Sequence, residues 1–390
     1  MTIMGIKITF WRVVFVVIMV LGLYSTYVRY LQGLGAVSNM NDNFPWGLWI
    51  GFDCLCGIML AAGGFVVTGA VYIFHVERLH CIVRSTVLTA FLGYVLFIVG
   101  LLFDLGRPWF IWHQLVYMNF HSVMFEVGMC VMTYTTVLFF EFLPNVLERF
   151  NLHAPIRWVK KIYPILIILG ILLSTLHQSS LGSLFLIVPE KMNPFWATPA
   201  LPFFFFLSAI ACGLAMTIFE STLSSRAFGR GLERSVLTEL GGALYVVLWV
   251  IALLRVEDYV NRGIVKSIFQ PSYEAYFLWA ELAMAFAIPL FILSFKAARK
   301  SPTMLYIASL STILGFVTNR LNVAMTSMET WIGHHYLPKW TEVSITLMIC
   351  AMGFFCFSLA VNYLPIFEDE HSEKHEPAPL IPIAEQTLVH

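Results

Sequence analysis

Charged residues are scarce in this chain of 390 residues, where Asp, Glu, Lys and Arg together make up 12%. Soluble domains carry about 25% of such residues, so an ordinary soluble domain is excluded. Hydrophobic residues make up 59% of the chain, and they gather in runs close to the roughly 20 residues that a membrane-spanning helix needs. The composition therefore predicts an all-α, polytopic membrane protein.

Several other patterns are also missing. The seven cysteines form no CxxC pair and no His/Cys metal spacing, which argues against a structural zinc or an iron–sulfur cluster in this chain. The net charge is zero and no basic tail is present, so we expect no nucleic-acid partner. The first apolar run lacks a small-residue cleavage site, so we expect a retained helix and not a signal peptide.

Hydrophobic runs remain when the sequence is divided at its charged and Pro/Gly-rich segments. They predict ten spans, at 9–31, 47–75, 83–103, 122–143, 159–179, 200–221, 236–254, 274–295, 302–323 and 341–361. With a cytoplasmic N-terminus, fifteen of the 23 Lys and Arg residues fall on the cytoplasmic side, and the positive-inside rule then places both termini there. We expect a membrane domain over 1–365 and a poorly ordered, acidic and Pro-rich cytoplasmic tail over 366–390.

Three acidic residues, Asp53, Glu126 and Glu281, lie well within predicted spans, where an unpaired charge costs several kcal/mol. At about 1.5 Å per residue they lie roughly 6 to 10 Å below the outer ends of their spans. Small residues follow Asp53 on one helical stripe, and we expect this stripe to pack against protein and not lipid. They are Gly57, Ala61 and Gly64.

Further polar side chains fall near the same level. They are Trp46, Asp104, Arg107, His121, His177, Gln178, Ser180 and Arg320. A group of acids, an arginine and a histidine on one side of the membrane is typical of a hydrated site. Two more acids, Glu141 and Glu220, lie at the inner ends of their spans, where they are either interfacial anchors or the cytoplasmic mouth of a proton path.

Three kinds of chemistry remain open. A b-haem cytochrome needs two axial histidines, and His121 with His177 is the pair at equal depth. A proton or small-solute transporter is expected to have broken helices, for which Pro289 and the Gly63–Gly64 pair offer kinks. A quinone site needs an apolar entrance from lipid, hydrogen-bond donors and a proton relay. Electrons for a quinone would have to come from a partner that bears clusters or haems, because this chain has no motif for a redox metal.

The whole chain resembles the membrane subunits of the NrfD/polysulfide-reductase type, in particular their HybB-like branch. The matching stretches, in chain order, are FPWGLWIGFD (44–53), FDLGRPW (103–109), SVMFE (122–126), FEFLPNVLERF (140–150), LHQSSLGSL (176–184), IFES (218–221), LWAEL (278–282) and the region of Arg320. LHQSS and FPWG are the more specific of these. His121 departs from the pattern of the hydrogenase branch.

This resemblance implies two four-helix bundles, formed by the second to fifth and the sixth to ninth spans, with the first and tenth spans flanking them. It implies a subunit of a respiratory oxidoreductase, not catalytic alone, in a prokaryotic cytoplasmic membrane. Its cofactor would be menaquinone or ubiquinone as a bound substrate, with no haem or iron–sulfur cluster in this chain. The partner would be an extracytoplasmic, four-cluster ferredoxin-like subunit, joined by a hydrogenase, a multihaem cytochrome c or a heterodisulfide-reductase-like arm.

The predicted site residues form two groups. For quinone binding we expect Trp46, Asp104, His121, His177, Gln178 and Ser180, and for proton relay Asp53, Glu126, Glu141, Glu220, Glu281 and Arg320. We expect the iron–sulfur partner to dock on the outer loops 31–45, 105–120, 180–199 and 324–340.

Overall fold

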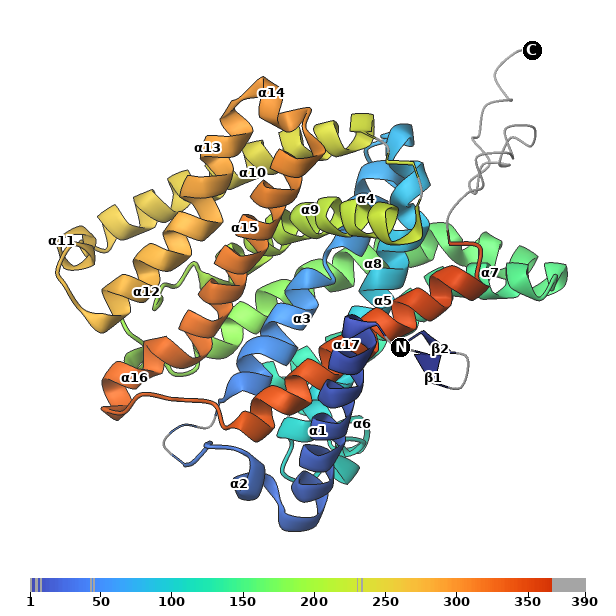
Figure 1. Cartoon of the computed structure of the whole chain (residues 1–390). Coiled ribbons are helices and arrows are strands. Elements are labelled where there is room, and N and C mark those ends of the chain that lie inside the picture. The colour runs from blue at the N-terminus through green and yellow to red at the C-terminus, as the bar shows by residue number, and fades with distance from the viewer. Residues whose placement is uncertain are drawn as a thin grey trace.

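The computed structural model describes residues 2–3, 6–7, 9–42, 44, 46–229, 231–232 and 234–366. Within this part of the chain, ten helical stretches are long and apolar enough to cross a membrane. Most of the predicted tail lies outside the described residues. The all-α, polytopic fold class is therefore confirmed (Figure 1).

Six of the first nine spans are single helices. They are α1 (Phe10–Gln32), α5 (His80–Asp104), α7 (Val123–Arg149), α8 (His153–Phe185), α9 (Leu201–Phe228) and α10 (Arg234–Asn261). The tenth span, α17 (Trp340–Tyr363), is also continuous. Short elements between them are β1 (Thr2–Ile3), β2 (Ile6–Lys7), α2 (Leu34–Val37), α6 (His113–Val116), α11 (Val265–Ile268) and α14 (Lys296–Arg299), with single turns at Glu77–Leu79, Pro108–Phe110 and Pro189–Lys191.

The other three spans, the second, eighth and ninth, each contain a π-helical segment. The second consists of η1 (Trp49–Cys54), α3 (Leu55–Leu60) and α4 (Gly63–Tyr72). The eighth consists of α12 (Tyr273–Leu282), η5 (Ala283–Ala287) and α13 (Ile288–Ser294), and the ninth of α15 (Pro302–Leu321), η6 (Asn322–Thr326) and α16 (Ser327–Ile332). π-Helical turns occur frequently at functional sites.

The structure differs from the predicted spans mainly in their length. The ninth span continues to Ile332, beyond its predicted end at 323, because Thr326, Ser327 and Glu329 lower the local hydropathy although all three are buried. The break predicted at Gly63–Gly64 is present, since α3 ends at Leu60 and α4 begins at Gly63. Pro289 lies in the first turn of α13, directly after η5.

The helices pack as two bundles with a flanking pair. The second span, α5, α7 and α8 form one bundle, and α9, α10 and the eighth and ninth spans form the other. The bundles meet where α9 packs against α3, α4 and α8. Figure 1 shows α1 and α17 side by side, and α17 also contacts α5 and η1.

Close helix contacts depend on small residues at these interfaces, as in other membrane bundles. A Cβ atom at Gly64 would lie 2.5 Å from the Cβ of Ala90, and one at Gly93 would lie 2.7 Å from the Cβ of Ala61. These contacts confirm that the stripe after Asp53 packs against protein. Gly57 is different, because a Cβ there would meet no atom within 4 Å.

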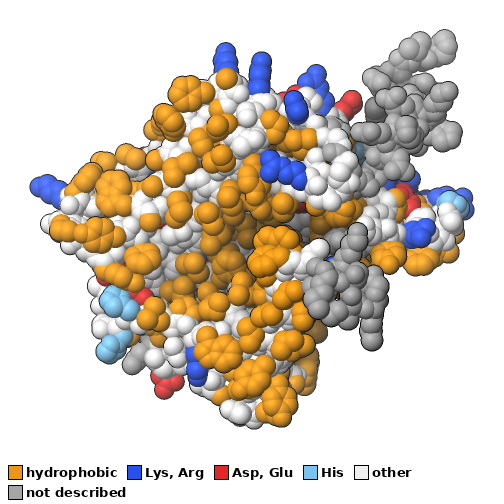
Figure 2. Space-filling model, in the orientation of Figure 1, with side chains coloured by type: hydrophobic (Ala, Val, Ile, Leu, Met, Phe, Trp, Pro, Cys, Tyr) orange, Lys and Arg blue, Asp and Glu red, His pale blue; other side chains and the backbone are white. Residues whose placement is uncertain are grey.

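The two ends of the molecule differ in charge. In Figure 2, Lys and Arg side chains gather along the upper edge, the end of the molecule that bears α14 in Figure 1. A broad hydrophobic surface covers the face below it, as expected of a multi-pass integral membrane protein. We refer to the two ends as the α14 end and the α16 end.

Candidate functional site

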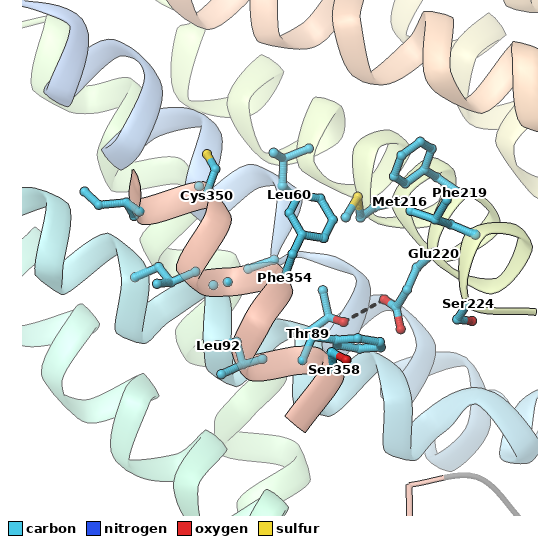
Figure 3. Close-up of a pocket in the computed structure, with 18 of the residues that line it drawn as sticks. Leu60, Thr89, Leu92, Met216, Phe219, Glu220, Ser224, Cys350, Phe354 and Ser358 are labelled. Atoms are coloured by element: carbon cyan, nitrogen blue, oxygen red, sulfur yellow. Dashed lines mark hydrogen bonds between the residues drawn. The ribbon is translucent and has the colours of Figure 1, made fainter. Parts of the chain in front are cut away.

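A cavity of about 490 Å³ lies between the second span, α5, α9 and α17 (Figure 3). Its wall is mostly apolar, and the side chains labelled in Figure 3 include Leu60, Leu92, Met216 and Phe219. Two exposed apolar side chains lie at its rim, Phe354 at 63% and Leu223 at 38% exposure. Since both belong to membrane-spanning helices, this side of the cavity faces the hydrocarbon region.

Asp53 is the polar group nearest the α16 end of this cavity. Its side chain is buried, and its Oδ2 accepts a 2.7 Å hydrogen bond from the Thr346 hydroxyl of α17. Asp53 belongs to η1, and Gly100 of α5 lies against it, since a Cβ at residue 100 would come within 2.8 Å of the Asp53 Cβ. The π-helical turn and this glycine together leave room for a carboxylate between three spans.

Glu220 is the second carboxylate of the cavity wall. It lies on α9 about 12 Å from the helix end at Phe228, and its Oε2 accepts a 2.7 Å hydrogen bond from the Thr89 hydroxyl of α5 (Figure 3). Ser224, Ser358 and Cys350 complete the polar lining. The cavity is thus an apolar chamber with one carboxyl group toward each end.

His177 and Gln178 are fully buried within the first bundle and do not line the cavity. The Nδ1 atom of His177 lies 3.0 Å from the Tyr94 hydroxyl oxygen, whereas its Nε2 has no hydrogen-bond partner among the described residues. Phe97 separates His177 from the cavity, because its ring lines the cavity wall and lies edge-on to the imidazole with centroids 6.2 Å apart. The Gln178 amide donates to the Ile58 carbonyl at 3.1 Å.

The other residues predicted to bind quinone are dispersed. Ser180 donates to a carboxylate oxygen of Glu126 at 2.5 Å, and the Trp46 ring packs edge-on against Phe185. Asp104 ends α5 with a buried, unpartnered Oδ1. His121 is exposed in the loop before α7. Among the described residues, the cavity lining includes two of the twelve predicted site residues, Asp53 and Glu220.

Glu281 lies at the centre of a hydrogen-bonded network in the second bundle. Its Oε1 accepts from Arg255 and Asn319, both at 2.8 Å, and its Oε2 accepts from Trp196 and Asn322, both at 2.9 Å. Four donors fill the four lone-pair positions of a carboxylate. This network holds together the loop before α9, the helix α10, and the eighth and ninth spans.

Arg320 adjoins this network but pairs with neutral groups. Its guanidinium donates to the Asn319 side chain, the Phe205 carbonyl and the Ser208 hydroxyl, and it stacks on the Phe205 ring at 3.5 Å. No carboxylate of the described residues forms an ion pair with it. Glu141, in the first bundle, is buried against Gly170 of α8.

Sequence reasoning missed several residues of these sites. Arg255 was excluded because the seventh span was predicted to end at 254, whereas α10 continues to Asn261. Glu342, one residue inside the predicted start of the tenth span at 341, is fully buried in the first turn of α17. A charged residue within or next to an apolar run could have indicated a buried polar site at each of these positions. Thr89 and Thr346 carried no such signal, because isolated threonines are common in membrane helices.

Comparisons with known proteins agree with this architecture. The family profile described as "Polysulphide reductase, NrfD" matches residues 36–331. The chain is 32% identical over 357 residues to the probable Ni/Fe-hydrogenase 2 b-type cytochrome subunit of Escherichia coli, a match that covers 89% of this chain and 91% of that protein.

Two further relatives have names that refer to reductases. The integral membrane subunit of the menaquinone reductase of Nitratidesulfovibrio vulgaris is 30% identical over 393 residues, with 93% of each chain covered. A selenate reductase subunit of Mesobacillus selenatarsenatis is 24% identical over 426 residues, covering 94% of this chain and 97% of that protein. The chain is therefore similar, over nearly its whole length, to membrane subunits of respiratory reductase complexes.

One expectation from the sequence is wrong. We expected no haem in this chain, but a relative that matches 89% of it is named a b-type cytochrome subunit, a name that implies haem. Among the described residues, His177 would be the one to hold a haem, because it is buried with an unpartnered Nε2 while its Nδ1 lies 3.0 Å from the Tyr94 hydroxyl.

Proposed function

The chain belongs to the NrfD polysulphide reductase family, and on that premise we propose that it is the quinone-reactive membrane subunit of a respiratory redox complex. In this role it exchanges electrons between a menaquinone or ubiquinone pool and a partner that bears iron–sulfur clusters. The chain acts with its partners and is not an oxidoreductase alone.

The lipid-facing cavity is the observation that carries this proposal. A quinone reaches its site through the bilayer, so the site needs an apolar entrance at membrane depth. The chamber of about 490 Å³ between α9 and α17 has such an entrance, with Phe354 and Leu223 at its rim. Its volume lies within the range of about 300–1,000 Å³ that is usual for small-molecule sites.

Quinone chemistry also requires protons at the head group. Quinone plus two electrons and two protons gives quinol, and the reverse reaction releases them. Asp53 and Glu220 place one carboxyl group toward each end of the cavity, which is the arrangement that proton exchange with a quinone oxygen needs. We propose that the head group binds beside Asp53, while Glu126, Glu141, Glu281 and Arg320 remain predictions as relay residues.

His177 remains part of the proposed quinone site, although it does not line the cavity. The Phe97 ring contacts the imidazole and lines the cavity, which places His177 one side chain behind the cavity wall. Trp46, Asp104, His121, Gln178 and Ser180 remain predictions as quinone contacts.

The proposal includes a haem because one relative is named a b-type cytochrome subunit. His177 is the fully buried histidine of the described residues, and its Nε2 would hold the iron while the Tyr94 hydroxyl fixes the ring through Nδ1. Haem supplies one-electron transfer when bound.

The orientation of the molecule follows from charge. The cationic α14 end would face the cytoplasm of a prokaryotic inner membrane, with both termini on that side. The α16 end would then face outward, and the loops around 31–45, 105–120, 180–199 and 324–340 would receive an extracytoplasmic iron–sulfur subunit.

Filling the cavity tests this function. Gly57 lines the cavity with free space at its Cβ position, so Gly57→Leu should leave the fold intact and lower quinone turnover by about tenfold or more. Gly242 of α10 also has free space at its Cβ and lies away from the cavity, so Gly242→Leu is a matched control. Wild-type quinone kinetics in assembled Gly57→Leu complex would contradict the proposal.

A further inference from the structure

A second hollow, of about 430 Å³, lies at the α16 end, outside the membrane spans. It is formed by the loop before η1 and the loop between α16 and α17, and polar groups gather in it. They are Asn39, Asn41, Asp42, His334, His335 and the ring of Tyr336. Two histidines, His334 and His335, are part of its lining.

Tyr336 connects this hollow to the interior. Its ring stacks on Phe44 with centroids 4.8 Å apart, and its hydroxyl donates a hydrogen bond to Oε2 of Glu342. Burial, together with the hydrogen bond to Glu342, raises the pKa of Tyr336 above its usual value. The phenol therefore stays protonated and keeps donating to the carboxylate.

Glu342 is fully buried at the start of α17. Its other oxygen, Oε1, accepts from the backbone N–H groups of Asn39 at 2.7 Å and Lys339 at 3.3 Å. Thr346 lies one turn further along the same helix, about 6 Å deeper, and donates to Asp53 at the wall of the quinone cavity. One helix face thus carries polar groups from this hollow to the cavity.

Asp104 is the last residue of α5, the helix that packs against both η1, which carries Asp53, and α17, which carries Glu342. Its Oδ1 is buried without a partner among the described residues, an arrangement that an ordered water satisfies. Arg29 of α1 holds the adjacent turn, since it donates to the carbonyls of Phe103 at 2.8 Å and Leu105 at 2.6 Å.

We propose that Asp104, Glu342 and Tyr336 form the route by which protons pass between Asp53 in the quinone cavity and the hollow at the α16 end. The inference rests on the proposed quinone function and assigns it a path. For each quinone reduced, two electrons arrive from the cluster-bearing partner and two protons arrive at the quinone oxygens. Oxidation of quinol sends two protons outward along the same residues.

The test uses the complete complex with 2,3-dimethyl-1,4-naphthoquinone as the quinone and reduced methyl viologen as the electron donor. Tyr336→Phe removes the hydroxyl and retains the stacked ring, and Glu342→Gln retains the side-chain shape. We expect each variant to lower quinone reduction by at least about tenfold and to increase its solvent deuterium isotope effect, as the loss of a proton-transfer group does. The naphthoquinone concentration for half-saturation should stay unchanged.

Matched controls lie at the same end of the molecule. Tyr30→Phe removes an exposed hydroxyl that donates to Leu102, and Glu274→Gln changes a carboxyl group that accepts from Thr330. Both should keep wild-type rates. Wild-type rates and isotope effects in Tyr336→Phe and Glu342→Gln would overturn the path and leave the quinone function standing, whereas no naphthoquinone reduction by the wild-type complex would overturn both.

Discussion

The hydroxyl of Thr346 donates a 2.7 Å hydrogen bond to the carboxylate of Asp53, although 293 positions separate the two residues in the chain. This contact joins the last span to the second at the wall of the cavity. It also fixes the direction of the carboxyl group that we place next to the quinone head group.

Removal of this carboxyl group should therefore affect turnover more than assembly. We expect Asp53→Asn to lower quinone turnover by about 100-fold, within the range for loss of a general acid or base, and Thr346→Val to lower it by a smaller factor. Thr133→Val is a suitable control, because Thr133 is exposed on α7 and donates to the Met129 carbonyl. Equal kinetics for Asp53→Asn and wild type would remove Asp53 from the site.

Occupancy of the cavity can be measured with Cys350, which lines it from α17. In a variant that retains Cys350 alone, a naphthoquinone should slow labelling by N-ethylmaleimide severalfold, because bound ligand covers the thiol. Cys356 is half-buried on the same helix and lies outside the cavity lining. In a variant that retains Cys356 alone, the thiol should be labelled at the same rate with and without quinone. Equal protection of both thiols would indicate a nonspecific effect.

The network around Glu281 should control stability. Glu281→Gln leaves Arg255 buried without its ion pair, and loss of one partner of a buried pair costs about 3–5 kcal/mol. We expect a clear decrease in the Tm of the detergent-solubilised complex. Glu239→Gln, which breaks the exposed pair with Arg78, should cost less than about 1 kcal/mol. Similar Tm values for the two variants would contradict a central role for Glu281.

His177 is tested by two readouts on one sample. We expect His177→Ala to assemble and to lose quinone turnover, because the imidazole lies directly behind Phe97 at the cavity wall. A pyridine haemochrome spectrum of the same preparation measures haem. Where the wild type has a b-haem band, the band should disappear in His177→Ala and persist in His80→Ala, whose ring packs on Tyr72.

Hydropathy and charge were sufficient to predict the ten spans, because membrane insertion demands long apolar helices, and the family resemblance predicted both bundles. The predicted stripe after Asp53 was also correct for Ala61 and Gly64, which contact α5. The lengths of the helices were less predictable. The ninth span was predicted too short, because Glu329 and its polar neighbours read as a loop while the folded protein buries them.

The site was harder to predict for a physical reason. Depth along a helix follows from residue number, but the direction of a side chain depends on which helices are neighbours. Asp53 and His177 were predicted near one level, but Phe97 separates the imidazole from the cavity that Asp53 lines. The π-helical turns add to this difficulty, since they rotate the side chains that follow them.

The π-helical turns also constrain how many residues the second, eighth and ninth spans can contain. A π-helical turn holds more residues than an α-helical turn, so deletion of one residue within η1, η5 or η6 would restore a regular helix and change the direction of the side chains within that turn. Asp53, which lies within η1, would then lose its direction toward Thr346, and Asn322, which lies within η6, would lose its direction toward Glu281. A single-residue deletion in the membrane would disconnect these carboxyl groups without replacing any of them.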